Sequence, residues 1–293
     1  MAIAPLEENT TSLAATIFDL YKTSDLNKTA RPTILVFDSG VGGLSVYQEI
    51  RKLLPDLHYI YTFDNEAFPY GEKTAEVIIE RVVQIIDTIQ KKHPLAVVVI
   101  ACNTASTISL PALRERFSFP VVGAVPAIKP AAKLTCNRVV GLLATRATVN
   151  RDYTRELIAR FATNCQMYSI GSAELVELAE RKLHGKDVPL EELEKILKPW
   201  LKMKEPPDTV ILGCTHFPLI AEELSQVLPN GTRLIDSGAA IARRTAWLIK
   251  NREDLFLTTA DNLAYCTKLE PASEVLRPVL RELGFLTLEK LAD

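Results

Sequence analysis

From Thr33 onward, short apolar runs alternate along the chain with longer stretches that mix apolar and charged residues. Apolar runs of about four to eight residues are typical of buried strands, and the mixed stretches have the length of helices. The clearest helical spacing runs from Val77 to Ile89. This alternation predicts the α/β fold class. The predicted strands are Ile34–Phe37, His58–Phe63, Ala96–Ala101, Val121–Val122, Val139–Leu143, Gln166–Ser169, Thr209–Leu212, Arg233–Ile235 and Leu263–Cys266.

Two segments share one pattern: a buried strand, a small residue, a cysteine, and polar residues that open a helix. They are Val97–Thr104 and Thr209–His216, and the preceding strands at Thr33–Phe37 and Arg138–Leu143 also correspond. Any two β/α units share part of this pattern, but the matched cysteines favour an internal duplication. The prediction is two similar α/β domains with mostly parallel sheets and an active site in the cleft between them.

The duplication also predicts domain boundaries. Residues 1–30 show no clean period and are interpreted as an N-terminal extension, partly helical around Leu13–Tyr21. The chain after the second repeat has no counterpart, so we expect it to return to the first half. The predicted first domain is therefore discontinuous, with residues 31–130 and 238–293, and the second spans residues 131–237.

Composition excludes several classes of protein. The 34 basic residues nearly balance the 36 acidic ones, whereas binding to nucleic acid or to a membrane surface needs a basic excess. No apolar run approaches the roughly 20 residues that span a bilayer. The N-terminus carries Glu7 and Glu8 and does not resemble a secretory signal. Five cysteines are few and odd in number, which is typical of reduced thiols, so we expect a cytoplasmic protein.

Cys102 and Cys214 each stand at the carboxyl end of a predicted strand, just before a predicted helix. A helix N-terminus stabilises a thiolate and is expected to lower the pKa of the thiol. Cysteine is otherwise a small buried hydrophobe, and this interpretation is kept for Cys136, Cys165 and Cys266, which lack that context.

Thiols at equivalent points of duplicated halves would face each other across a cleft. This arrangement suits a reaction in which a proton leaves one face of a carbon and returns to the other. A single nucleophile would need only one cysteine. A zinc site could use Cys102, Cys214 and His216, but Cys-x-His is not a typical ligand spacing and no CxxC exists, so no metal is predicted.

Further polar candidates follow the first two strands. The Asp38–Gly43 loop combines glycines, which allow close approach to a bound group, with a helix start that favours anions. Asp38 could instead be only an N-cap. The Phe68–Lys73 segment is by itself only a turn, but it lies on the same edge of the sheet. His216 adjoins a candidate thiol, whereas Glu180 taken alone favours a solvated helix face.

Four motifs together resemble those of the glutamate racemases of bacterial cell-wall synthesis. They are Asp38–Gly43, Pro69–Gly71, Ala101–Thr104 and Gly213–His216, and the resemblance runs in order from Thr33 to the end of the chain. It implies two α/β domains, no pyridoxal phosphate or other cofactor, no metal, and racemisation of L- and D-glutamate that supplies D-glutamate for peptidoglycan.

The resemblance also implies roles for single residues. Cys102 would take the proton from D-glutamate and Cys214 from L-glutamate. Asp38 and His216 would assist the two thiols, with Glu180 near His216. The implied substrate-binding residues are Asp38, Ser39, Pro69, Tyr70, Gly71, Asn103, Thr104, Thr215 and His216.

The N-terminal extension and one further stretch are similar to the enterobacterial branch of these racemases. That branch is activated by the precursor UDP-N-acetylmuramoyl-L-alanine. The resemblance implies activator contacts at Arg114 and at Gly123, Ala124, Val125, Pro126, Ala127, Ile128 and Lys129, with Arg114 and Lys129 meeting the anionic groups. The alternative is a helix, a strand and a Pro-rich turn with ordinary surface charges.

Other functions stay open from the sequence. The nearest is an aspartate racemase or another amino-acid racemase of the same superfamily, although Thr215 and His216 favour glutamate. A non-catalytic anion-binding protein of the same fold is a second alternative, and a pyridoxal enzyme is a third. The expected partners are glutamate and the activator, without nucleic acid or membrane, in a monomer or homodimer.

Overall fold

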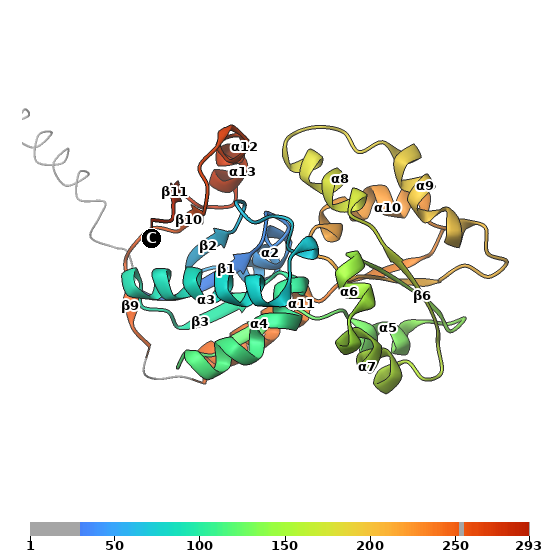
Figure 1. The fold of residues 1–293 in the computed structure, drawn as a ribbon, viewed down its shortest axis with the longest axis horizontal. Helices are drawn as coiled ribbons and strands as arrows, with labels where there is room; N and C mark the ends of the chain where they lie inside the picture. Colours follow the sequence, from blue (N-terminus) through green and yellow to red (C-terminus); the bar gives the residue numbers. More distant parts are fainter. Residues whose placement is uncertain (1–29, 252–254, 293) are drawn as a thin grey trace, which may run out of the picture.

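The computed structural model describes residues 30–251 and 255–292 (Figure 1). The predicted N-terminal extension, with the helix expected around Leu13–Tyr21, lies outside the described residues except for Ala30. The described chain forms two sheets that lie side by side, each with helices on both faces (Figure 1). No helix in these two ranges is long and apolar enough to span a membrane.

The first sheet has seven strands, and its helices come from both ends of the described chain. The strands are β1 (Arg31–Asp38), β2 (His58–Phe63), β3 (Val97–Ile100), β4 (Val121–Gly123), β9 (Leu257–Thr258), β10 (Leu263–Cys266) and β11 (Thr287–Lys290). The helices are α2 (Leu44–Leu53), α3 (Ala75–Lys92), α4 (Asn103–Arg116), α11 (Gly238–Lys250), α12 (Pro271–Val275) and α13 (Arg277–Glu282), with the 3₁₀ turn η1 (Tyr70–Glu72). The strand order is β11-β10-β2-β1-β3-β4, and β9 pairs antiparallel with the start of β1.

The second sheet has four parallel strands. They are β5 (Val139–Ala144), β6 (Gln166–Gly171), β7 (Thr209–Leu212) and β8 (Arg233–Ile235). The helices are α5 (Ile128–Leu134), α6 (Arg146–Asn150), α7 (Asp152–Phe161), α8 (Glu174–Leu183), α9 (Leu190–Leu201) and α10 (Ala221–Val227), with the 3₁₀ turn η2 (Phe217–Ile220). The strand order of this sheet, β6-β5-β7-β8, repeats the order β2-β1-β3-β4 of the first sheet, as a duplication predicts.

The predicted α/β class is confirmed, and so are the nine predicted strands. The tail returns to the first sheet, where β10 pairs with β2 and β11 extends the sheet outward. Strands of the first sheet come from residues 31–123 and 257–290, and those of the second from residues 139–235. The exact domain boundaries stay a prediction.

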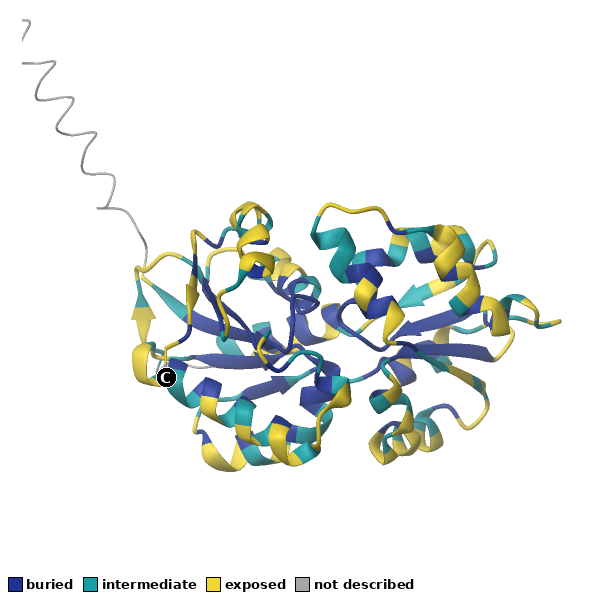
Figure 2. Ribbon diagram, turned by 45° about the horizontal axis from the view of Figure 1, so that its top comes forward, coloured by how far each residue is buried: buried dark blue, intermediate teal, exposed yellow. Residues whose placement is uncertain are grey.

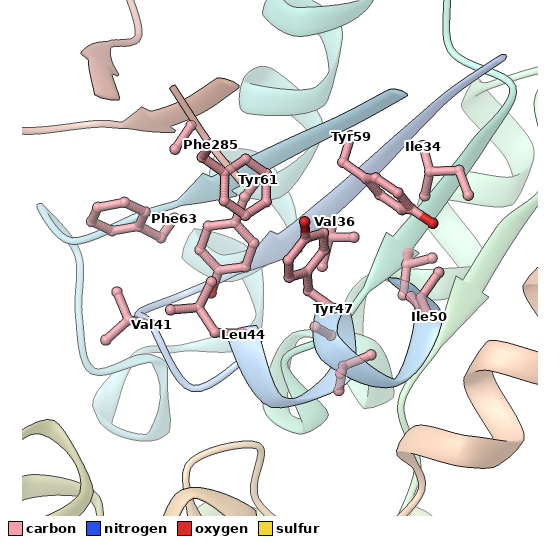
Figure 3. Packing of buried hydrophobic residues seen from close by; sticks show 14 of the residues in the cluster. Ile34, Val36, Val41, Leu44, Tyr47, Ile50, Tyr59, Tyr61, Phe63 and Phe285 are labelled. Carbon is pink, nitrogen blue, oxygen red and sulfur yellow. The ribbon is translucent and has the colours of Figure 1, made fainter. Parts of the chain in front are cut away.

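Both faces of the first sheet are buried, which explains its continuous apolar runs (Figure 2). Successive side chains of a strand point to opposite faces. Ile34 and Val36 therefore pack in the cluster formed with α2 and α11, which Figure 3 shows, whereas Leu35 and Phe37 pack under α3 and α4. This core fixes the carboxyl ends of the strands, where the candidate site residues begin.

Candidate active site

A cavity of about 340 Å³ lies between the carboxyl ends of the two sheets. Cys102, after β3, and Cys214, after β7, both line it, so the structure brings the two predicted thiols to one space. The other predicted catalytic and substrate-binding residues except Glu180 line it as well; these are Asp38, Ser39, Pro69, Tyr70, Gly71, Asn103, Thr104, Thr215 and His216.

Cys102 is the N-cap residue of α4, and its Sγ accepts a hydrogen bond from the Ala105 N–H at 3.4 Å. Ser39 Oγ lies 3.5 Å from the same sulfur. The residue is only 6% exposed, and this burial raises the pKa of the Cys102 thiol well above its ordinary value, with the charge of Asp38 adding to the effect. The prediction of a lowered thiol pKa is wrong here, because lost hydration outweighs the helix N-terminus.

Cys214 is 7% exposed, and its sulfur lies 3.8 Å from Nδ1 of His216. The α-helix predicted directly after it is wrong, because a 3₁₀ turn, η2, follows instead. Pro218 accounts for the difference, because it has no N–H to close an α-helical bond to the Cys214 carbonyl, which instead accepts from the Phe217 N–H at 3.1 Å. The imidazole is therefore the described polar partner of this thiol, in place of the helix N-terminus that Cys102 caps.

His216 is held by Glu180, whose Oε1 accepts a hydrogen bond from Nε2 at 2.6 Å. Burial by itself would lower the pKa of His216, but the Cys214 sulfur and the Glu180 carboxylate outweigh it and raise that pKa well above its ordinary value. Glu180 thus points inward from α8, and the solvated face that its sequence position favours is wrong. It stands behind His216 and does not line the cavity.

Asp38 is fully buried at the end of β1. Oδ1 accepts a hydrogen bond from the Ser39 N–H at 2.6 Å, and Oδ2 accepts from the Gly43 N–H and from Oγ1 of Thr215 at 3.2 Å. The carboxyl group therefore fixes the loop before α2, and it also reaches Thr215, which follows a strand of the second sheet. The alternative that Asp38 is the N-cap of this helix is wrong, because the N-cap is Gly43. Burial raises the pKa of Asp38, while His216 and these hydrogen bonds act against the increase.

The Pro69–Gly71 turn forms one wall of the cavity. Tyr70 is almost fully buried, and its hydroxyl donates to Oδ2 of Asp64 at 2.7 Å. Its contribution to the cavity is therefore the ring and the backbone, and the hydroxyl is engaged elsewhere. Asp64 was not singled out from the sequence.

Polar groups from the second sheet complete the lining. Thr145 and Thr148, which sequence reasoning missed, line the cavity after β5. Thr145 Oγ1 lies 3.5 Å from Oγ1 of Thr104 and donates to Oγ1 of Thr148 at 3.0 Å. Their position at the strand that repeats β1 was the one available signal. Oδ1 of Asn103 is buried and has no hydrogen-bond partner among the described residues.

The residues that the resemblance implies for activator binding do not all lie at one site in the structure. Arg114 and Gly123 line a second cavity of about 550 Å³, and Arg244 of α11, not predicted, lines it too. Nζ of Lys129 instead lies 5.3 Å from the ring centre of Phe161. Ala124, Ala127 and Ile128 are buried and Val125 and Pro126 lie between them.

Two like α/β units with a buried thiol at each side of a shared cavity define an enzyme of acid–base chemistry. Within residues 30–251 and 255–292, no cluster of three or more His, Cys, Asp or Glu could hold a metal ion. The chain belongs to the Asp/Glu/hydantoin racemase family, whose sequence model matches residues 34–245.

Individual relatives narrow the comparison. A glutamate racemase of Photorhabdus laumondii is 74% identical over 291 residues, and one of Serratia proteamaculans is 69% identical over 291, each covering 99% of both chains. The crystal structure of Escherichia coli glutamate racemase superposes with a TM-score of 0.88 at 69% identity, over 89% of this chain and 98% of that chain. That enzyme was crystallised with L-glutamate and the activator UDP-MurNAc-Ala.

Proposed function

We propose that this protein interconverts L-glutamate and D-glutamate by moving one proton on and off the α-carbon. The main observation that supports this proposal is that Cys102 and Cys214 line one cavity and follow strands of two different sheets. The glutamate racemases that are 69–74% identical over nearly the whole chain support glutamate as the substrate.

The proton moves between two opposed thiols. The thiolate of Cys102 removes the α-proton of D-glutamate and becomes a thiol. The thiol of Cys214 then donates its proton to the opposite face of the same carbon, which leaves L-glutamate and the Cys214 thiolate. The reverse reaction uses the two residues in the opposite order, so each acts as both acid and base.

Burial makes the thiolate a stronger base. The α-proton of an amino acid is a very weak acid, and an ordinary thiolate is a modest base. The raised pKa of the Cys102 thiol narrows this gap. The substrate ammonium offsets the cost of the buried thiolate by its opposite charge, so the base forms where the substrate binds. Donors placed before the reaction around the cavity stabilise the developing negative charge.

Asp38 and His216 assist one thiol each. Asp38 acts on Cys102, because the negative charge of Asp38 helps to raise the pKa of the Cys102 thiol. His216 acts on Cys214 through the contact of 3.8 Å, and Glu180 keeps its imidazole protonated. Glutamate carries two carboxylates and one ammonium. The other predicted substrate-binding residues bind these charged groups. Oδ1 of Asn103, which has no hydrogen-bond partner within the described residues, is an acceptor suited to the ammonium.

Circular dichroism of a purified sample with L-glutamate tests this function. The signal is expected to decay to zero without added pyridoxal phosphate, and Cys102→Ser and Cys214→Ser each reduce the rate by at least about 10³-fold. The exposed thiol of Cys136 lies outside the cavity, so Cys136→Ser is the matched control with an unchanged rate. Racemisation of L-aspartate but not L-glutamate, or full activity of either site variant, would contradict the proposal.

The proposed product also leads us to expect a cytoplasmic location. D-Glutamate is a component of peptidoglycan, and a cytoplasmic racemase supplies it to the enzymes that build the cell-wall precursor. The expectation of a monomer or a homodimer is tested by analytical ultracentrifugation.

The second cavity is our proposed site for an activator, UDP-N-acetylmuramoyl-L-alanine. Arg114 and Arg244 supply two guanidinium groups suited to a diphosphate. The Arg244 guanidinium lies 4.4 Å from the ring centre of Trp247, which is 54% exposed and offers an aromatic surface beside it. Turnover with and without the precursor tests the site: Arg244→Ala is expected to lose activation while keeping the basal rate. Equal rates with and without precursor in the unmodified protein would count against activation.

A further inference from the structure

Asp64 lies directly after β2 and is completely buried, yet each of its carboxylate oxygens accepts two hydrogen bonds. Oδ2 accepts from the Tyr70 hydroxyl at 2.7 Å and from Nε of Arg81 at 2.6 Å. Oδ1 accepts from Nη2 of Arg81 at 2.6 Å and from Oγ1 of Thr267 at 2.7 Å. A buried carboxylate with all of its donors in place is held rigidly, because losing any one of them leaves charge uncompensated.

These residues converge from distant parts of the chain. Asp64 follows β2, Arg81 lies on α3, and Thr267 follows β10 in the C-terminal tail. Arg81 and Thr267 both donate to Asp64, and Asp64 in turn accepts from the hydroxyl of Tyr70, which lies in the turn that lines the substrate cavity. The backbone of Asp64 is also tied to the site, because its N–H donates to the carbonyl of Asp38 at 3.1 Å.

We propose that Asp64, Arg81 and Thr267 are positioning residues that anchor the Tyr70 hydroxyl and thereby fix the cavity wall formed by the Pro69–Gly71 turn. The proposal rests on the glutamate racemisation proposed above. None of the three lines the cavity, so their side chains act on the substrate through the turn. The C-terminal tail, through Thr267, is then a determinant of substrate affinity.

The wall binds the substrate without taking part in proton transfer. Loosening it therefore weakens binding of the ground state and the transition state alike, which raises KM and leaves kcat nearly unchanged. A purely structural role gives a different result. Loss of folded protein lowers the maximal rate per total protein and leaves KM where it was.

Thr267→Val is the sharpest variant, since it replaces one hydroxyl by a methyl group of similar volume. The chain offers a matched control in Thr62, on the neighbouring strand β2, whose buried Oγ1 has no hydrogen-bond partner among the described residues. Thr62→Val makes the same chemical change without breaking a hydrogen bond. Thr267→Ser keeps the hydroxyl and is the conservative rescue.

Steady-state racemisation of both enantiomers, followed by circular dichroism, gives the result. Thr267→Val is expected to raise KM for glutamate by about 3- to 10-fold with kcat within about twofold, whereas Thr267→Ser and Thr62→Val keep the original KM. Arg81→Met, which removes two of the four hydrogen bonds, is expected to raise KM by about 10- to 100-fold.

Three outcomes would overturn the proposal that these residues anchor Tyr70. They are an unchanged KM in Thr267→Val, a lower maximal rate with an unchanged KM in that variant, and equal effects of Thr62→Val and Thr267→Val on KM. Failure of the proposed function is separate, because the unmodified protein would then show no glutamate turnover at all.

Discussion

Replacing Gly42 by alanine places a methyl group against the imidazole of His216. A Cβ at this position would lie 2.3 Å from Nδ1 and 2.6 Å from Cγ of the ring. Non-bonded atoms of this kind approach to about 3.5 Å, so the ring must move by about 1 Å. Nε2 is held by Glu180 at 2.6 Å, and Nδ1 lies 3.8 Å from the Cys214 sulfur. The displacement therefore breaks at least one of these two contacts.

A displacement of about 1 Å in a catalytic group costs about 10²-fold in rate. We therefore expect Gly42→Ala to lower kcat for racemisation of both enantiomers by about 100-fold. Exchange of the α-proton of D-glutamate with solvent deuterium starts at Cys102 and is expected to continue. Circular dichroism measures the first rate, and proton NMR in deuterium oxide measures the second.

Gly141→Ala is the control for this experiment. Its Cβ would lie 2.7 Å from the ring of Trp200, so it introduces a comparable clash with a buried ring away from the cavity. It is expected to lower the free energy of unfolding by about 1–3 kcal/mol while kcat is kept. A folded Gly42→Ala protein with the original racemisation rate would refute the role assigned to His216.

Three further predictions concern pH and stability. Glu180→Gln removes a carboxylate that raises the pKa of His216, so the alkaline limb of the pH–rate profile moves to lower pH; an unmoved limb would count against the pairing. Burial opposes ionisation of Asp64, but its hydrogen bonds prevail and lower its pKa, so its stabilising effect is present above the ordinary carboxyl pKa and lost as pH falls through the lowered value. Thr267→Val is therefore expected to shift acid unfolding, followed by circular dichroism, to higher pH, and an identical transition would contradict this. Ser106→Ala removes a buried hydroxyl that bonds the Ile100 carbonyl and the Ala124 N–H, which also bond each other at 3.0 Å, so it is expected to cost only about 1 kcal/mol in urea unfolding; no loss would show that the hydroxyl adds nothing to the backbone bond.

The strands could be predicted because both sheets are covered on both faces, which makes each central strand an apolar run. Two strands were missed for a physical reason. β9 has two residues, and β11, at the edge of its sheet, buries only Leu288 of its four residues. A strand with one buried side chain produces no hydrophobic pattern. The return of the tail was predictable only from the count of duplicated elements.

The sequence could predict those site residues that follow the repeated strands. Cys102 and Cys214 stand out because a rare residue recurs in the same local pattern. Thr145 and Thr148 do not, since threonine after a strand is common and no pattern marks it. Asp64 and Arg81 meet only through folding across 17 residues. The raised pKa of Cys102 could not be predicted, because burial of a side chain depends on the packing of the whole domain.

The position of β10 beside β2 affects how the chain folds while it is being synthesised. The outer edge of β2 stays unpaired until residues 263–266 emerge from the ribosome. About 200 residues separate the two strands, which at roughly 5–20 residues per second corresponds to about 10–40 s. All strands of the second sheet emerge within that interval. An open strand edge invites pairing with other chains, so the nascent protein passes through a period of aggregation risk that ends only with its last-made strands.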